Sequence, residues 1–74
     1  MDSVDQRDAL ATAAAARGES LAALSRLIGR NAAYLQQFVV RGTPRLLGEA
    51  DRRKLARYLG IADAALGGPP AEGL

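Results

Sequence analysis

Cysteine and histidine are absent from the 74 residues of this chain, and aromatic residues are scarce. The first two absences exclude disulfide bonds, zinc fingers, thiol nucleophiles and catalysis by an imidazole base. One Phe, two Tyr and no Trp, set against many Ala and Leu residues, favour closely packed helices over a β-sandwich. The eight carboxylates form no pattern typical of an active site. We therefore predict an all-α protein with no metal, no cofactor and no enzymatic activity.

Long apolar segments are missing too. The longest runs span only a handful of residues, such as 13–16, whereas a bilayer crossing needs about 20. The N-terminal segment carries Asp2, Asp5 and Asp8 and lacks a basic region followed by an apolar stretch, so it does not have the form of a secretory signal. The length fits one small domain. We expect a cytoplasmic protein with no membrane segment.

Charge is distributed unevenly along the chain. Residues 26–57 contain most of the basic side chains, whereas residues 1–25 and 58–74 each have an acidic excess. A basic centre is typical of a protein that binds a polyanion, because neutralised phosphates release their counterions. Nearly all the cations are Arg, whose planar fork suits phosphate oxygens and guanine edges. The codon usage of a GC-rich genome is the alternative explanation for this composition.

Capping residues and glycines divide the chain into short helices. We expect helices over residues 3–17, 21–28, 32–40 and 49–59 (the last starting at 48 or 49), a short fifth helix near 62–66, and a flexible tail or linker over 67–74. The expected start signals are Ser3 with Gln6 as a capping box, Ser20 and Asn31, and the expected stop signals are Gly18, Gly29, Pro44 and Gly60.

Helical spacing predicts the side chains that form the core. The expected inward residues are Leu10, Ala13 and Ala14 with the stem of Arg17; Leu21, Leu24, Leu27 and Ile28; Leu35, Phe38 and Val39; Leu55, Ala56 and Leu59; and Ile61 with Leu66.

Two helices joined by a tight Gly-containing turn, over residues 20–40, form a helix-turn-helix unit. The residues Leu24-Ser25-Arg26-Leu27-Ile28-Gly29, Tyr34-Leu35 and Phe38, with the later run Leu55-Ala56-Arg57-Tyr58-Leu59-Gly60-Ile61, resemble the Cro/cI/Xre repressor superfamily. More narrowly, residues 24–38 followed by Arg41-Gly42-Thr43-Pro44-Arg45 resemble the N-terminal domain of LexA-like, cI-type repressors of α-proteobacteria. Ser25 and Arg30 depart from the superfamily, which usually has Ala and an apolar residue there.

The resemblance implies a lambda-repressor-like domain of four to five helices over residues 1–66, a sequence-specific transcriptional regulator whose recognition helix, about 32–40, enters the major groove of double-stranded DNA. With Leu35 and Phe38 pointing inward, the expected base contacts are Asn31, Ala32, Ala33, Gln36 and Gln37. The expected phosphate contacts are Ser20, Arg30, Tyr34, Arg41, Thr43 and Arg45.

The expected target is a palindromic operator that is bound by a homodimer. We expect a repressor of this kind to be associated with the nucleoid. The chain is either a naturally short regulator or part of a longer repressor with a self-cleaving C-terminal domain. The competing interpretation is a protein-interaction module with the same fold, such as an antitoxin or an adaptor. Some of these residues also have an ordinary structural interpretation. Gln36 and Gln37 could belong to a solvated helix face, Asn31 could act only as a helix cap, and Tyr34 could be a packing residue. The run Arg52, Arg53 and Lys54 has no assigned role.

Overall fold

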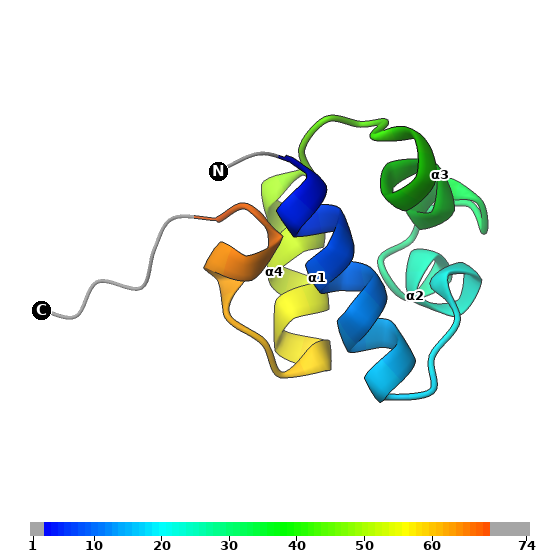
Figure 1. Ribbon diagram of the computed structural model, residues 1–74. Coiled ribbons are helices and arrows are strands. Elements are labelled where there is room, and N and C mark those ends of the chain that lie inside the picture. The colour runs from blue at the N-terminus through cyan, green and yellow to red at the C-terminus, as the bar shows by residue number, and fades with distance from the viewer. Residues whose placement is uncertain (1–2, 69–74) are drawn as a thin grey trace, which may run out of the picture.

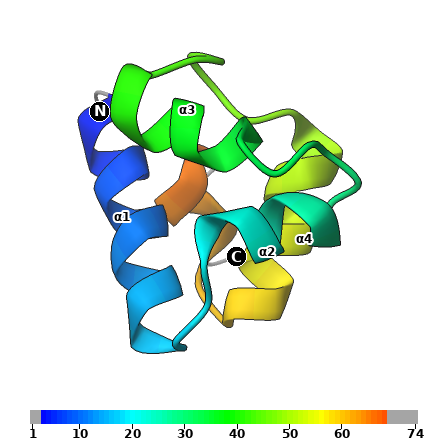
Figure 2. The same ribbon diagram turned by 90° about the vertical axis from the view of Figure 1, so that its right-hand side faces the viewer.

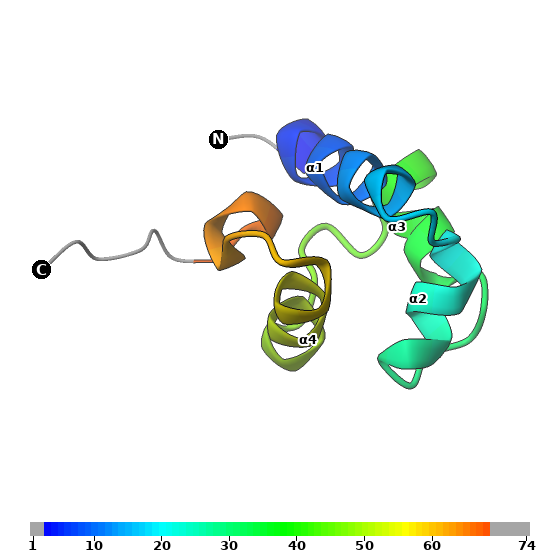
Figure 3. The ribbon, with the colours of Figure 1, turned by 90° about the horizontal axis from the view of Figure 1, so that it is seen from below.

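The computed structural model describes residues 3–68, with side chains from residue 6 onward, and this part of the chain is all helical. The elements are α1 (Ser3–Ala16), α2 (Leu21–Leu27), α3 (Tyr34–Arg41), α4 (Glu49–Leu59) and the short 3-10 helix η1 (Asp63–Leu66) (Figure 1). α3 packs against α1 and α2, and η1 packs against α1 and α4. η1 therefore lies at the end of the molecule away from α2 and α3 (Figures 1 and 3). The prediction of a compact all-α domain of four to five helices is confirmed.

Local signals account for most helix boundaries. Ser20 precedes α2 in extended conformation, and its Oγ accepts a hydrogen bond from the backbone N–H of Ala23 at 3.0 Å, as its sequence position predicts. Gly42 and Gly60 follow α3 and α4 with φ values of +72° and +71°, a left-handed conformation that L side chains rarely adopt. α1 and α2 each end one residue earlier than predicted, at Ala16 and Leu27.

The capping box predicted at the start of α1 required the Gln6 side chain to accept the backbone N–H of Ser3, and this part of the prediction is wrong. The Gln6 side chain is buried and lies against Gly67, where an added Cβ would come within 3.0 Å of its Oε1. Among the described residues this Oε1 has no hydrogen-bond partner, so it does not accept the backbone N–H of Ser3. Gln6 instead joins the beginning of α1 to the end of η1.

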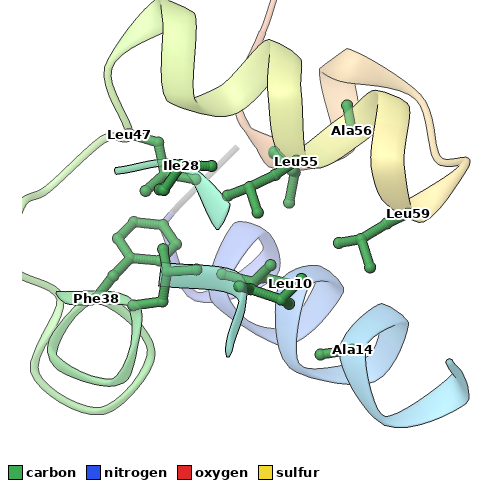
Figure 4. Packing of buried hydrophobic residues seen from close by; sticks show 11 residues of the cluster. Leu10, Ala14, Ile28, Phe38, Leu47, Leu55, Ala56 and Leu59 are labelled. Atoms are coloured by element: carbon green, nitrogen blue, oxygen red, sulfur yellow. The ribbon is translucent and has the colours of Figure 1, made fainter. Parts of the chain in front are cut away.

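One apolar cluster receives side chains from every helix (Figure 4). Phe38 and Leu35 from α3, Leu10 from α1 and Leu55 from α4 are fully buried in it. The remaining members are Ala14, Leu24, Ile28, Leu47, Ala56, Leu59 and Leu66. Burial of these apolar side chains stabilises the packing of the inner face of α3 against the other helices. The outer face of α3 does not take part in this core.

Leu27 corrects the predicted inner face of α2, since it is 47% exposed. Leu24 and Ile28 are buried four residues apart and Leu21 is half-buried beside them. Leu27 lies roughly a quarter-turn from that stripe, at 100° per residue, and so falls outside it. The predicted inner face of α2, made of residues 21, 24, 27 and 28, was therefore wider than the face that the core covers.

Gly67 and Gly68 belong to the folded domain and not to the predicted tail of residues 67–74. The backbone N–H groups of Gly67 and Gly68 donate to the carbonyl oxygens of Ala64 and Asp63 and so end η1. Residues 69–74 lie outside the described part of the chain. Within residues 3–68, no helix combines the length and the apolar character that a membrane crossing requires.

Candidate nucleic-acid interface

The connection between α2 and α3 is a chain of tight turns (Figure 2). Gly29 has a φ of +79°, and the N–H of Arg30 donates to the carbonyl of Ser25 at 2.9 Å. Asn31 then accepts two hydrogen bonds, from the N–H of Ala33 to its Oδ1 and from the N–H of Tyr34 to its carbonyl oxygen. Because this turn occupies residues 32 and 33, the helix starts at Tyr34, two residues later than predicted.

Ser25 holds α3 onto α2 from inside the core. Its side chain is fully buried, its Oγ donates to the carbonyl of Leu21 at 2.7 Å, and the N–H of Leu35 donates to the same Oγ at 3.0 Å. The first N–H groups of a helix have no partner within the helix, and Ala33, which precedes α3, has no side-chain cap. The hydroxyl of Ser25 thus satisfies a donor of the first turn of α3.

The outer face of α3 presents one stripe of exposed side chains, hereafter the α3 stripe, made of Ala33, Gln36, Gln37 and Val40. These positions follow the spacing i, i+3, i+4, i+7, which places them on one side of a helix. They lie opposite Leu35 and Phe38, both of which have no exposed surface. Three of the four were predicted to contact bases.

Val40 is the member of the α3 stripe that sequence reasoning missed. It is 66% exposed, the highest value among the large hydrophobic residues that the structure leaves at the surface. Its neighbour Val39 is half-buried against the core, as predicted. The spacing of Val40 to Gln36 and Gln37, four and three residues, was the available signal, but an apolar residue there was not considered for binding.

Two other predicted base contacts lie just before α3. Asn31 is exposed, yet its Oδ1 accepts the N–H of Ala33 within the turn. Its side-chain amide nitrogen is the part left for another molecule. Ala32 is half-buried, so it presents less surface than Ala33.

The predicted phosphate contacts separate into different environments. Arg41, Thr43 and Arg45 are exposed at and beyond the C-terminal end of α3. Ser20 is exposed but already caps α2 through its hydroxyl. Tyr34 is half-buried and packs against the core, which agrees with the packing alternative.

Arg30 is paired within the protein. Its Nε donates a hydrogen bond to Oδ2 of Asp51 at 3.0 Å, and its Nη2 lies 2.9 Å from the same oxygen in the ion pair. Its guanidinium carbon lies 4.8 Å from the centre of the Tyr34 ring. Asp51 is 7% exposed in the first turn of α4 and was not expected to take part in the site.

The segment of the chain that contains α3 carries an excess of positive charge. From residue 20 to residue 48 the chain contains no Asp or Glu, and its four cations are Arg26, Arg30, Arg41 and Arg45. Arg30 has its carboxylate partner in α4, whereas no ion pair is found for the other three among residues 6–68. The surface beside the α3 stripe is therefore suited to an anionic partner.

Arg7 adds a further cation at the C-terminal end of α3. It extends from α1 so that its Nη1 would lie 2.9 Å from a Cβ placed on Gly42. Its Nε is buried and, among the described residues, has no hydrogen-bond partner. A cation at this end also complements the helix dipole of α3.

The three consecutive basic residues of α4, Arg52, Arg53 and Lys54, make different contacts. Arg52 binds Asp63 of η1 at 2.9 Å, a hydrogen bond that raises the pKa of Arg52, and Arg53 binds Glu49 one turn earlier at 2.8 Å. Lys54 lines a groove of about 920 Å³ between the end of α2 and α4. The other groove-lining residues are Leu27, Arg53, Ala56, Arg57, Tyr58, Ile61 and Asp63. None of them belongs to α3.

Comparison with known protein families, with curated proteins and with solved structures finds no match for this chain.

Proposed function

We propose that this chain is a helix-turn-helix domain of the Cro/cI/Xre type that binds double-stranded DNA sequence-specifically, as a transcriptional regulator that represses its target. The observation that carries the proposal is the α3 stripe, an exposed line of two Gln, one Ala and one Val on a helix whose other face is buried. The absence of any carboxylate between residues 20 and 48 supports it, because a DNA surface repels negative charge.

In this proposal α3 enters the major groove and reads base edges. The side-chain amides of Gln36 and Gln37 bond N6 and N7 of adenine, and the methyl groups of Ala33 and Val40 contact thymine methyl groups. The amide nitrogen of Asn31 supplies one further donor at the start of the helix.

Phosphates are bound at the end of α3 in this proposal. Arg41 is the last residue of the recognition helix, and Thr43 and Arg45 follow it along the chain. All three are exposed and contact the backbone that borders the groove. These contacts set the affinity for any duplex and its salt dependence, whereas the α3 stripe discriminates among sequences.

The proposed target is a palindromic operator occupied by two copies of the chain, with half-sites about one helical turn apart. Each copy then presents one α3 to one half-site. A regulator of this kind acts at the chromosome, that is, in the nucleoid of the cytoplasm.

A selection experiment with a salt titration tests the proposal. The protein is mixed with fragments of genomic DNA and with random duplexes at rising salt, and the fragments retained at the highest salt are sequenced. We expect enrichment of a palindrome, and loss of that enrichment in the double variant Gln36→Ala/Gln37→Ala. Retention that falls equally for all sequences as salt rises would reject specific binding. It would favour the competing protein-interaction module, which is then sought on the same surface.

A further inference from the structure

The pair Arg30–Asp51 joins three elements at the start of α3. Arg30 lies in the turn after α2, Asp51 in the first turn of α4, and Tyr34 is the first residue of α3. The guanidinium lies 4.8 Å from the Tyr34 ring centre, its Nε donates a hydrogen bond to Oδ2 of Asp51, and its Nη2 lies 2.9 Å from that oxygen. A planar cation held on one side by a carboxylate and over an aromatic face on another has a defined position.

Asp51 is well placed to anchor this contact. Its side chain is 9% exposed, against 47% for Arg30, so the carboxylate is the buried and immobile partner. It is the third residue of α4, where the helix dipole favours a negative charge.

The pairing also changes what Arg30 offers to DNA. A cation bound to a carboxylate at 2.9 Å carries little net field outward, and a nearby phosphate meets the charge of Asp51 as well. Arg41 and Arg45, by contrast, have no ion-pair partner among residues 6–68. Arg30 is thus set apart from the arginines proposed to bind phosphate.

We propose that Arg30 and Asp51 are positioning residues for the recognition helix: Asp51 holds Arg30 against Tyr34, which fixes the first turn of α3 relative to α4, and Arg30 neutralises no phosphate. The inference rests on the proposed function, since it concerns how α3 is presented to DNA. It reassigns Arg30 and gives a role to Asp51, which no sequence pattern indicated.

The test compares DNA binding by Asp51→Asn, by Arg30→Met and by the double variant. Asn keeps the shape of Asp51, and Met keeps an aliphatic stem at position 30 to cover Tyr34. Each single variant should lower affinity for the selected operator by about 2- to 100-fold, the range typical of coupled contacts. Because the double variant removes one charge of each sign, it should leave affinity for random duplex and the salt dependence unchanged. The double variant should lose no more than the worse single variant. Far-ultraviolet circular dichroism at the assay temperature checks that each variant is folded, and only folded variants are compared.

Arg41→Ala is the matched control, because it removes an unpaired arginine near the other end of α3 and should lower the salt slope by about 0.9. The inference is overturned if the charge-balanced double variant lowers the slope by the same amount, because Arg30 would then neutralise a phosphate of its own. Additive losses in the double variant would overturn it as well. Should the unsubstituted protein enrich no operator, the proposed function itself fails, and the inference with it.

Discussion

The side-chain hydroxyl of Ser25 accepts the backbone N–H of Leu35 at 3.0 Å inside the core, so α2 satisfies a donor of the first turn of α3. This bond connects residues ten positions apart and lies directly beneath the proposed recognition helix. It makes the orientation of α3 depend on a polar group within an otherwise apolar interface.

Ser25→Ala should reduce the free energy of unfolding by about 1 to 3 kcal/mol, because it leaves the buried N–H of Leu35 without a partner. Urea denaturation followed by circular dichroism measures the loss. Thr12→Ala, an exposed hydroxyl in the middle of α1, is the control and should change stability by no more than about 0.5 kcal/mol. Equal effects of the two substitutions would show that the Ser25 bond contributes nothing.

Phe38→Ala should be the most damaging core substitution of α3. Its cost of about 3 to 5 kcal/mol equals the net stability, about 3 to 5 kcal/mol, that the core of so small a domain supplies. The reason is that its ring is fully buried at the meeting point of the helices. Val40→Ala, on the exposed side of the same helix, should stay within about 0.5 kcal/mol in the same denaturation experiment. A large loss of stability at Val40 would mean that the α3 stripe is not a free surface.

Gln36→Ala and Gln37→Ala should each weaken binding to the selected operator by about 1 to 3 kcal/mol, with a much smaller effect on random duplex. Both side chains are exposed, so neither substitution disturbs the core. Fluorescence anisotropy with the two DNAs at one salt concentration separates the effects. Equal weakening of both DNAs would place base recognition elsewhere.

Arg41→Ala and Arg45→Ala should weaken binding to operator and random duplex alike, because phosphate contacts carry no sequence information. Each should lower the slope of log affinity against log salt by about one. Arg53→Ala is the matched control, since Arg53 pairs with Glu49 on α4 and should leave the slope unchanged. If Arg53→Ala changed the slope and Arg41→Ala did not, the phosphate contacts would lie on α4 and not at the end of α3.

Tyr58 should titrate above the ordinary tyrosine pKa of 10.0, because it donates a hydrogen bond to the Glu19 carboxylate, which favours the protonated phenol. The contribution of this bond to stability is therefore complete below the unfolded-state pKa and is lost as pH rises through the higher folded-state pKa. Tyrosinate absorbance in a Tyr34→Phe background follows Tyr58 alone, since the chain has two Tyr. Glu19→Gln should return the titration toward 10, and an unchanged titration would exclude the bond in solution.

The sequence by itself determined the elements that depend on neighbours along the chain. Ser20 and Gly60 mark helix ends because a side-chain acceptor and a left-handed glycine act within one turn, and the spacing of Leu35 and Phe38 gives the outer face of α3 once the inner face is known. Errors of one or two residues arise where a turn competes with the helix, as at Asn31.

Only the tertiary structure decided which distant residues meet. The partner of Arg30 lies 21 residues away in α4, Ser25 bonds Leu35 across two helices, and Leu27 is exposed because the core covers a narrower face of α2 than its apolar pattern offers. Such contacts are set by how the helices pack, and nothing in the local spacing of charges or hydroxyls encodes that packing. The positive charge that the α3 region leaves unpaired among the described residues is for this reason a property of the fold, although the arginines that supply it are plain in the sequence.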